Sequence, residues 1–306
     1  MRAVQYRTFG EPADVMSLAT VDEPHAGPGA VRIAVEAIGV NPVDWKVLGG
    51  AMSGASAGDE VPGGPTTPGM DVAGVVDEVG DGAGEVAVGD RVVGYAASGA
   101  LAEHAVLQVW ARAPEEVTSE QAATLPVPAE TALRVLEALG LEEGQTLLVD
   151  GGAGAVGIAI TQIALSRGAQ VVATASEANH DFLRELGAVP TTYGEGLVER
   201  VRALEPQGVD GALDAAGKGS VRDLVELTGD PARVVTIADF GAGELGVQVS
   251  GGDDQRGRRL QEAARLAGLG VVRIPVARTY PLEEAVAAYE ESRGGHVRGK
   301  LVITTR

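Results

Sequence analysis

Short apolar runs separated by glycine- and proline-rich turns dominate the first 117 residues. Three of these runs, 31–40 (VRIAVEAIGV), 74–80 (GVVDEVG) and 90–96 (DRVVGYA), are rich in β-branched residues. Runs of this length bounded by turn residues are typical of strands, so the pattern predicts a compact, mostly antiparallel β domain. The segment 49–68 is rich in Gly, Ser, Ala and Pro, and we expect it to be a mobile surface loop.

The pattern changes to a helical period near residue 118. Thr118 or Ser119 can cap a helix, and Leu133, Leu136 and Leu139 follow at helical spacing. Helical stretches then alternate with strand-like runs, which predicts βαβ units and a parallel sheet. These runs are TLLVD (146–150), QVVATAS (170–176), GALDAAG (211–217) and RVVTIADF (233–240).

The last fifty residues return to β structure. The run VVRIPVART (271–279) is followed by a predicted helix, PLEEAVAAYEES, with Pro281 at its first position and acidic residues in its first turn. The run GKLVITT (299–305) closes the pattern.

A glycine motif lies between the first predicted strand of the parallel sheet and an apolar helix. Gly152, Gly154 and Gly157 stand in GxGxxG register, with Ala153, Ala155 and Val156 between them. Such glycines allow a tight turn and a close approach of the backbone to a pyrophosphate, which then meets the positive end of the helix dipole. The sequence therefore predicts a dinucleotide site, and the alternative is a turn that only reverses the chain.

The next strand bears on the choice of coenzyme. An NAD site normally has Asp or Glu at the end of this strand, where it binds the adenosine ribose, whereas Ser176 stands at that position here. A hydroxyl can donate to a 2′-phosphate that a carboxylate would repel, so we predict NADPH, with His180, Tyr193 and Arg184 as candidate phosphate partners. A shift of one residue would instead place Glu177 on the ribose, so NAD remains the alternative.

Composition excludes several classes of partner and site. The 306 residues include 43 acidic against 24 basic side chains, a formal charge of −19, which disfavours nucleic acid and anionic membrane surfaces. The start of the chain lacks the apolar segment of a secretory signal, so we expect a cytoplasmic protein. The chain has no cysteine and its four histidines are scattered, which argues against a metal site.

Several motifs together resemble the medium-chain dehydrogenase/reductase superfamily, specifically its zinc-free quinone oxidoreductase (zeta-crystallin-like) branch. The resemblance covers nearly the whole chain and includes the glycine motif. The other motifs are GVNPVDWKV (39–47), TPGMDVAGVV (67–76), VGDRVVGY (88–95), ATLPVPAETA (123–132), LRELGA (183–188), VDGALDAAG (209–217) and HVRGKLVI (296–303).

The resemblance implies an α/β fold with two domains. A Rossmann domain with a doubly wound parallel sheet would span 119–255. A GroES-like, mostly antiparallel β domain would be built from 1–118 and 256–306. A homodimer is the assembly that the resemblance implies.

The resemblance also bears on the metal. Zinc-dependent alcohol dehydrogenases of the superfamily hold the catalytic zinc with Cys, His and Cys, and the matching positions here are Asn41, Met70 and Val127. These side chains cannot form that site, and alcohol oxidation without a Lewis acid loses its main electrostatic support. The resemblance thus implies a substrate that accepts hydride without a metal, a quinone or an α,β-unsaturated carbonyl.

Catalytic candidates follow from the motif NPVD. Asn41 is a candidate donor to the substrate carbonyl and Asp44 an orienting acid, although Asn-Pro also commonly opens a turn. Lys46 and Tyr6 are candidates to relay a proton to the enolate, and solvent water could do the same.

Further cofactor contacts are implied by other motifs. Thr131 resembles a residue that packs near the nicotinamide, and Lys300 stands where the family often reaches toward the cofactor. Ala216 and Ile237, in the third and fourth predicted strand-like runs of the parallel sheet, complete this set. Thr131 could equally be a buried threonine at a helix start, and Lys300 a solvated charge.

Two features depart from the family pattern. Glu177 stands near the position where relatives that bind NADPH often have Lys, and His104 in SGALAEHAV replaces a common aromatic residue. Tyr95, Trp45 and Trp110 could line an apolar slot for a flat substrate or simply fill the core.

The sequence thus predicts a zinc-independent, NADPH-dependent oxidoreductase. Two alternatives remain open. One is an enoyl reductase dedicated to a biosynthetic pathway, and the other is a protein that binds NADPH without turnover.

Overall fold

The computed structural model describes residues 1–305. The chain folds into two compact units. Unit 1 comprises Met1–Val127, Leu260–Gly268 and Ile274–Arg306, and unit 2 comprises Pro128–Arg259 and Leu269–Arg273. Two helices, α4 (Pro126–Leu139) and α9 (Arg256–Gly268), belong partly to each.

Unit 1 is built around a six-stranded sheet in the order β13-β14-β3-β4-β5-β6. Its pairings are antiparallel except for β13 with β14, and β3 also pairs with β6, so strands β3 to β6 close into a barrel. The barrel strands are β3 (Val31–Gly39), β4 (Asp71–Val79), β5 (Arg91–Ala96) and β6 (His104–Arg112).

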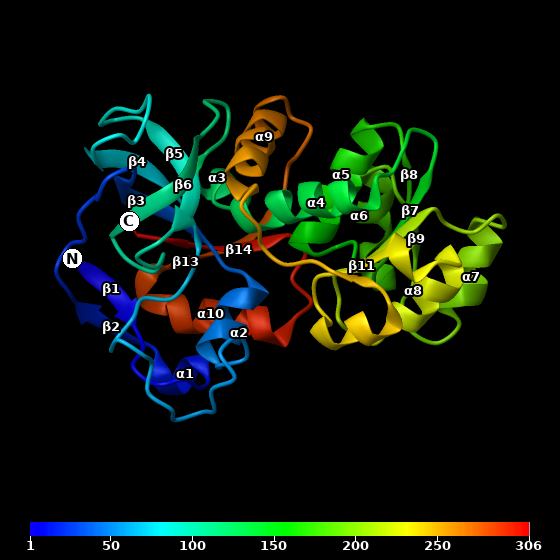
Figure 1. The fold of residues 1–306 in the computed structure, drawn as a ribbon, viewed down its shortest axis with the longest axis horizontal. Helices are drawn as coiled ribbons and strands as arrows, with labels where there is room; N and C mark the ends of the chain where they lie inside the picture. Colours follow the sequence, from blue (N-terminus) through cyan, green and yellow to red (C-terminus); the bar gives the residue numbers. More distant parts are fainter. Residues whose placement is uncertain (306) are drawn as a thin grey trace. The chain divides into compact units, whose positions relative to one another are not determined.

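Both ends of the chain contribute to unit 1. Strand β14 (Lys300–Thr304), from the end of the chain, pairs with β3, and the red and blue ribbons accordingly lie side by side in Figure 1. The remaining elements are β1 (Arg2–Gln5), α1 (Pro12–Val15), β2 (Ser17–Thr20), α2 (Pro42–Leu48), α3 (Ser119–Ala122), β13 (Val276–Pro281), η4 (Leu282–Glu284) and α10 (Ala285–Gly294).

Unit 2 contains a six-stranded, fully parallel sheet in the order β12-β11-β10-β7-β8-β9. This is the strand order of the doubly wound dinucleotide-binding fold, in which the order reverses between β7 and β10. The strands are β7 (Thr146–Asp150), β8 (Gln170–Thr174), β9 (Val189–Thr191), β10 (Gly211–Asp214), β11 (Val234–Thr236) and β12 (Gln248–Val249).

Helices and short 3₁₀ turns connect these strands. Every residue of β7 is buried, as expected for a central parallel strand that is covered on both faces. The connections are α5 (Ala155–Ser166), η1 (Glu177–Asn179), α6 (His180–Glu185), α7 (Leu197–Leu204), α8 (Val221–Thr228), η2 (Pro231–Arg233) and η3 (Phe240–Leu245).

The structure confirms the predicted fold class and differs in some local bounds. The helical stretch after Thr118 is two helices, because Thr118 caps only α3 and α4 starts anew at Pro126; Leu133, Leu136 and Leu139 are buried on α4. Pro281 ends β13 and precedes the short turn η4, so the last helix starts at Ala285. The prediction that the last helix begins at Pro281 was therefore wrong, although proline is common at the first position of a helix.

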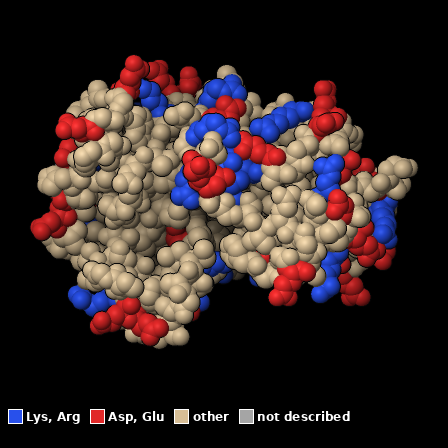
Figure 2. Space-filling view, in the orientation of Figure 1, with Lys and Arg blue, Asp and Glu red and all other residues tan. Residues whose placement is uncertain are grey.

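The surface fits the composition. Acidic and basic side chains are interspersed over the face in view in Figure 2, with no continuous basic patch there. Within residues 1–305, every helix is too short or too polar to cross a membrane.

Candidate functional site

The glycine motif forms the turn between β7 and α5. Strand β7 ends at Asp150, Gly151 adopts φ +92°, and α5 starts at Ala155 with Gly154 as its N-cap. The Gly154 N–H donates to the Gly151 carbonyl at 3.2 Å, which closes the turn. The first N–H groups of a helix have no partner within it, so the N–H groups of Ala155, Val156 and Gly157 and the positive end of the α5 dipole lie at this turn.

Two of the three glycines are required by packing and the third leaves open space. A Cβ on Gly157 would lie 2.3 Å from the Gly151 oxygen, and one on Gly152 would lie 2.7 Å from Ala173 Cβ. A Cβ on Gly154 would meet only the Gly151 oxygen, at 3.5 Å. Gly152 therefore lets the turn pack tightly against β8 and Gly157 lets α5 pack against the turn, while Gly154 leaves open space beside the backbone.

A buried hydroxyl–carboxylate group supports this turn. Thr174 Oγ1 accepts from Gly151 N at 3.1 Å and donates to Asp150, whose other oxygen accepts from Ser220 Oγ. Burial raises the pKa of the Asp150 carboxyl, and the hydrogen bonds from Ser220 and Thr174 oppose that shift. The sequence analysis missed this group, although Asp and Thr at the ends of adjacent apolar strands were a readable signal.

A similar group orders the next two strand ends. Asp214 accepts from Ala216 N at 3.1 Å and Gly217 N at 2.7 Å, and its second oxygen accepts from Thr236 Oγ1 at 2.7 Å. Ile237 N donates to the Asp214 carbonyl at 3.0 Å. The predicted cofactor residues Ala216 and Ile237 thus lie together at the carboxyl edge of the sheet, where ligands of such folds bind.

The residues predicted to choose the coenzyme follow β8. The strand ends at Thr174, and Ser176, two residues later, is the N-cap of η1 and accepts from Asn179 Nδ2 at 3.3 Å. His180 Nε2 lies 3.4 Å from the Ala175 carbonyl, so it is near Ser176, and Glu177 is exposed. Asn179 is an additional polar neighbour that the sequence analysis did not single out.

The other two candidate phosphate partners lie at the surface. Tyr193 is 52% exposed, and no contact joins its side chain to Ser176 within residues 1–305. Arg184 forms an ion pair with Asp181 at 2.6 Å.

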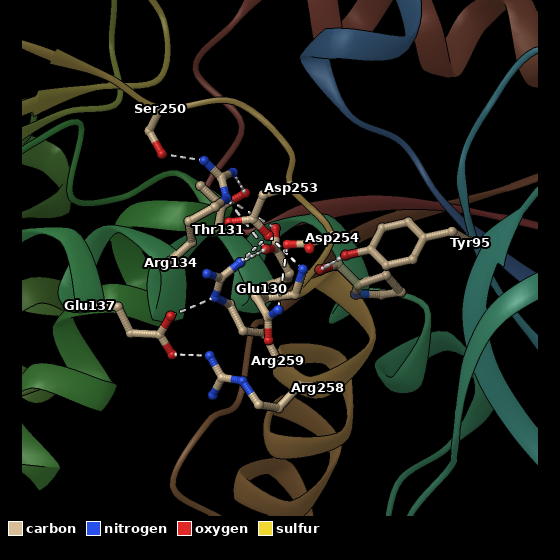
Figure 3. A network of polar contacts seen from close by, with 12 residues as sticks. Tyr95, Glu130, Thr131, Arg134, Glu137, Ser250, Asp253, Asp254, Arg258 and Arg259 are labelled. Carbon is tan, nitrogen blue, oxygen red and sulfur yellow. Dashed lines mark hydrogen bonds and ion pairs between the residues drawn. The ribbon is translucent and has the colours of Figure 1, made fainter.

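Thr131 belongs to a network of polar side chains on α4 (Figure 3). Its hydroxyl accepts from Arg134 Nη2 at 3.1 Å, and Arg134 Nη1 also donates to Ser250 Oγ. Thr131 is 5% exposed, so the structure places it as a buried residue of the first turns of α4, as one of the sequence readings expected.

Asn41, Asp44 and Lys300 come together in unit 1. Asn41 caps α2, its N–H donates to Asp44 Oδ2 at 2.8 Å, and Pro42 occupies the first helical position. Lys300, at the start of β14, donates to Asn41 Oδ1 and lies 3.2 Å from Asp71 Oδ2. All four polar side chains are buried, so Lys300 is not a solvated charge.

Asp71 is the functional candidate that the sequence analysis missed in this cluster. It is fully buried at the start of β4, and its two carboxylate oxygens accept from Val127 N at 3.2 Å each. Its position in TPGMDVAGVV was visible, but nothing in the sequence showed that it would face Lys300.

Burial dominates the electrostatics of this cluster. It raises the pKa of Asp44 to about 7, and the Asp71 carboxylate adds to that shift while Asn41 and Lys300 oppose it. Burial likewise raises the pKa of Asp71 and lowers the pKa of Lys300. Asp44 can therefore hold a proton near neutral pH.

Tyr6 and Tyr289 border the same cluster. Burial raises the pKa of Tyr289 well above its usual value, and the negative charge of Asp44 adds to this. Within residues 1–305, Asn41 Nδ2, Asp44 Oδ1 and the Tyr289 hydroxyl are buried without a hydrogen-bond partner. Tyr6 is buried against Phe9, and burial raises its pKa.

Lys46 is not part of this cluster. It lies on another face of α2, and its ammonium is 5.7 Å from the centroid of the Trp45 ring. The Trp45 indole N–H donates to Ser292 Oγ at 3.2 Å, and the Tyr95 hydroxyl donates to the Pro126 carbonyl at 2.6 Å. These aromatic residues are thus held by structural contacts.

The cluster also brings together positions that the resemblance equates with zinc ligands. Asn41 contacts Lys300, Val127 N binds Asp71, and Met70 directly precedes Asp71. In the described part of the chain, no three His, Cys, Asp or Glu side chains are grouped so that they could hold a metal ion.

Comparisons with known proteins agree with this architecture. The family model "Alcohol dehydrogenase GroES-like domain" matches residues 27–116, and "Zinc-binding dehydrogenase" matches residues 186–303. Quinone oxidoreductase from Mus musculus is 30% identical over 99% of this chain and 97% of its own length. Erythronolide synthase EryA2 from Saccharopolyspora erythraea is 34% identical over 90% of this chain, which spans 8% of that protein.

Solved structures show the same fold. The NADPH complex of the mycobacterial protein Rv1454c has a TM-score of 0.84 at 26% identity and covers 99% of each chain. An NAD-dependent alcohol dehydrogenase has a TM-score of 0.87 at 27% identity and covers 100% of each chain. By its sequence relatives and its fold, the chain belongs to the medium-chain dehydrogenase/reductase superfamily, in the quinone oxidoreductase branch, and is an oxidoreductase.

Proposed function

We propose that this oxidoreductase transfers hydride from NADPH to a quinone or an α,β-unsaturated carbonyl without a catalytic zinc ion. The observation that carries the proposal is the buried Lys300–Asp71 ion pair, 3.2 Å between Nζ and Oδ2, with the Asn41 amide beside it. The ammonium of Lys300 repels a divalent cation where zinc-dependent relatives would hold one.

The donor set at these positions does not fit zinc. Structural and catalytic zinc sites use Cys, His, Asp and Glu, whereas Asn41, Met70 and Val127 offer an amide, a thioether and an apolar side chain. The Asp71 carboxylate already accepts from Lys300 and from Val127 N, and Asp44 accepts from the Asn41 N–H. A substrate whose negative charge is delocalised after hydride addition is the class that such a site can serve.

Asn41 is proposed to stabilise that charge. Lys300 Nζ donates to Asn41 Oδ1 and so fixes the orientation of the amide. Asn41 Nδ2 is then a buried donor with no hydrogen-bond partner in residues 1–305. An unpaired buried donor binds a developing oxyanion more strongly than it would in water. Asp44, with its pKa raised to about 7, is proposed to orient Asn41 through the Asn41 N–H.

NADPH would supply the hydride when bound, and unit 2 offers the residues to hold it. The N-terminus of α5 and Gly154 are proposed to bind the pyrophosphate, and Ser176 with His180 the 2′-phosphate. The NADPH complex of Rv1454c supports this coenzyme, while the NAD-dependent alcohol dehydrogenase of similar fold supports the alternative, NAD. For NAD, Glu177 is the candidate to bind the ribose. Tyr193 is retained as a candidate at the adenosine end.

The test is consumption of NADPH and NADH, followed at the nicotinamide absorbance, with 9,10-phenanthrenequinone and with a conjugated enone supplied separately. We expect turnover with NADPH that survives exhaustive treatment with a chelator. Loss of activity on chelation, restored by Zn²⁺, would overturn zinc independence. Asn41→Leu should lower kcat more than it raises the KM for NADPH.

A second candidate function is supported by the match to erythronolide synthase EryA2, a protein of a biosynthetic pathway. It is reduction of an enoyl group, which keeps the same hydride transfer and leaves a saturated C–C bond instead of a hydroquinone. Product analysis by mass spectrometry separates the two. NADPH that binds but is never consumed on either acceptor would favour the non-catalytic alternative.

The domain bounds 1–118 with 256–306 and 119–255, the homodimer and the cytoplasmic location remain proposals. Expression of residues 119–255 alone tests whether they fold as a domain. Light scattering coupled to size exclusion gives the mass in solution, which should be twice that of a 31.1 kDa chain.

A further inference from the structure

Arg134 connects Thr131 with the segment after β12. Its Nη2 donates to Thr131 Oγ1 at 3.1 Å, and its Nη1 donates to Ser250 Oγ. Its Nε donates to Glu130 at 3.3 Å, and the Arg134 side chain is only 10% exposed. In Figure 3 the guanidinium group accordingly lies between the two hydroxyls.

Both hydroxyls therefore act as acceptors toward Arg134. A hydroxyl also carries one proton to donate, and within residues 1–305 no acceptor is present for the proton of Thr131 or of Ser250. Because Thr131 is 5% exposed, its unmet donor costs free energy that a bound acceptor would recover. In the described residues, the buried Thr131 hydroxyl and the half-buried Ser250 hydroxyl thus each keep a proton that no protein acceptor takes.

This pair lies at the ligand-binding edge of the parallel sheet. Ser250 directly follows β12, and its N–H donates at 2.9 Å to the carbonyl of Thr236, the last residue of β11. The next residue in the chain after β11 is Ile237, one of the predicted cofactor contacts. Ligands of doubly wound folds bind at the carboxyl ends of the strands, so an acceptor for the two hydroxyls belongs to a ligand bound there.

A set of ion pairs around the buried Arg259 and Glu130 side chains holds Arg134 and this segment in place. Arg259 contacts Glu130 at 3.1 Å, Glu137 at 2.7 Å and Asp253 at 2.6 Å, with its side chain 7% exposed. Glu130 is therefore shared by Arg134 and Arg259, and Asp253 ties the segment after Ser250 to α9 (Figure 3). The hydrogen bond from Arg259 lowers the pKa of Asp253, so this tie stays charged at neutral pH.

We propose that Arg134 is a positioning residue that aims the Thr131 and Ser250 hydroxyls at the carboxamide oxygen of the nicotinamide ring. This inference rests on the proposed function, because it requires that unit 2 binds a nicotinamide coenzyme. An amide carbonyl has two lone pairs and no proton, so its oxygen can accept a hydrogen bond from each of the two hydroxyls. The guanidinium group donates one N–H to each hydroxyl, so the proton of each hydroxyl points away from Arg134 and can be donated to a ligand.

The test compares two ligands that differ only at the nicotinamide end. Dissociation constants for NADPH and for ADP-ribose 2′-phosphate, which lacks the nicotinamide, are measured by calorimetry on wild type and Arg134→Met. We expect Arg134→Met to raise the dissociation constant of NADPH by about tenfold or more, because two hydrogen bonds to the nicotinamide are lost. The dissociation constant of ADP-ribose 2′-phosphate should rise by less than about twofold. A general loss of structure would weaken both ligands alike.

Arg258→Met is the matched control. It removes another guanidinium of the same network, which contacts Glu137 at 2.8 Å and is 57% exposed, but touches neither hydroxyl. Thr131→Ser, which keeps the hydroxyl, should bind NADPH within about twofold of wild type, while Thr131→Val and Ser250→Ala should each lose about threefold to tenfold.

The outcomes separate this inference from the proposed function. If wild type binds neither NADPH nor NADH, the proposed function fails. If wild type binds NADPH and Arg134→Met changes the affinities for both ligands equally, or changes neither, the role of Arg134 is overturned while the proposed function stands. Should Arg134→Met fail to fold, the Thr131 and Ser250 variants decide, and unchanged NADPH affinity in both overturns the inference.

Discussion

Lys300 and Asp71 form an ion pair that is almost completely removed from solvent, with side-chain exposures of 2% and 0%. The two residues are 229 positions apart in the chain and meet because β14 and β4 both flank β3. Asn41 and the Val127 N–H complete the set of partners. The pair thus joins the end of the chain to its first third in one buried polar centre.

Removing one partner of this pair should be strongly destabilising. Lys300→Met leaves the Asp71 carboxylate buried without its counterion, and we expect a loss of about 3–5 kcal/mol in the free energy of unfolding. The double variant Lys300→Met/Asp71→Asn should recover part of this loss. Urea denaturation measures both, and Lys218→Met, at an exposed lysine, is the control. A double variant less stable than Lys300→Met would contradict this account.

Asp44 should make the protein less stable as the pH rises toward neutrality. Its folded pKa of about 7 lies above the ordinary 3.8, so the folded state binds more protons than the unfolded state between these values. Its contribution is favourable at low pH and is lost as the pH rises through about 7, on the order of 1.4 kcal/mol per pKa unit. Urea midpoints of wild type and Asp44→Asn at pH 5 and pH 8 isolate this effect. The drop between the two pH values should be smaller in the variant, and an equal drop would refute it.

The glycines of the β7–α5 turn should separate packing from ligand binding. Gly157→Ala places a methyl group 2.3 Å from the Gly151 oxygen and should cost about 1–3 kcal/mol of stability. The methyl group of Gly154→Ala has no neighbouring atom closer than 3.5 Å, so this variant should change stability by less than about 1 kcal/mol. It should nevertheless weaken NADPH binding about tenfold. Thermal unfolding with calorimetric titration checks both. Unchanged NADPH affinity in Gly154→Ala would contradict the proposal that this turn binds the pyrophosphate.

The residue at position 176 should set the coenzyme preference. Ser176→Asp adds a carboxylate that repels a 2′-phosphate, so kcat/KM for NADPH should fall about tenfold or more while that for NADH is kept or improved. Glu177→Gln tests the other alignment. If Glu177 binds the ribose, this variant lowers the use of NADH, and Ser176→Asp has little effect on either coenzyme.

The sequence was sufficient to predict the fold class and the glycine turn, because these depend on local patterns. The roles of Asn41 and Asp44 follow from the family resemblance and stay predictions. Strand periodicity, turn residues and the spacing of three glycines are all encoded within a few positions. The bounds of β8 and of the last helix were less readable, since a polar or proline residue at a strand end is compatible with either neighbouring element.

The partners of these residues could not be predicted in the same way. The contacts of Lys300 with Asp71 and of Arg134 with Ser250 join positions more than a hundred residues apart. Their meeting depends on strand order and on helix packing, which a single sequence does not show. For the same reason, Tyr289 was read only as part of a helix, although its hydroxyl lies at the buried cluster.

The Thr–Asp pairs at the ends of the parallel strands have a consequence for how the sheet assembles. Thr174 donates to Asp150 between β8 and β7, and Thr236 donates to Asp214 between β11 and β10. Each central strand is otherwise a short run of similar apolar residues that could align with its neighbour in more than one register. A slip by one residue would bury a carboxylate away from its hydroxyl, at a cost of about 1–3 kcal/mol or more for each pair. Each pair therefore favours one register between two neighbouring parallel strands. One pair lies on each side of the point where the strand order reverses.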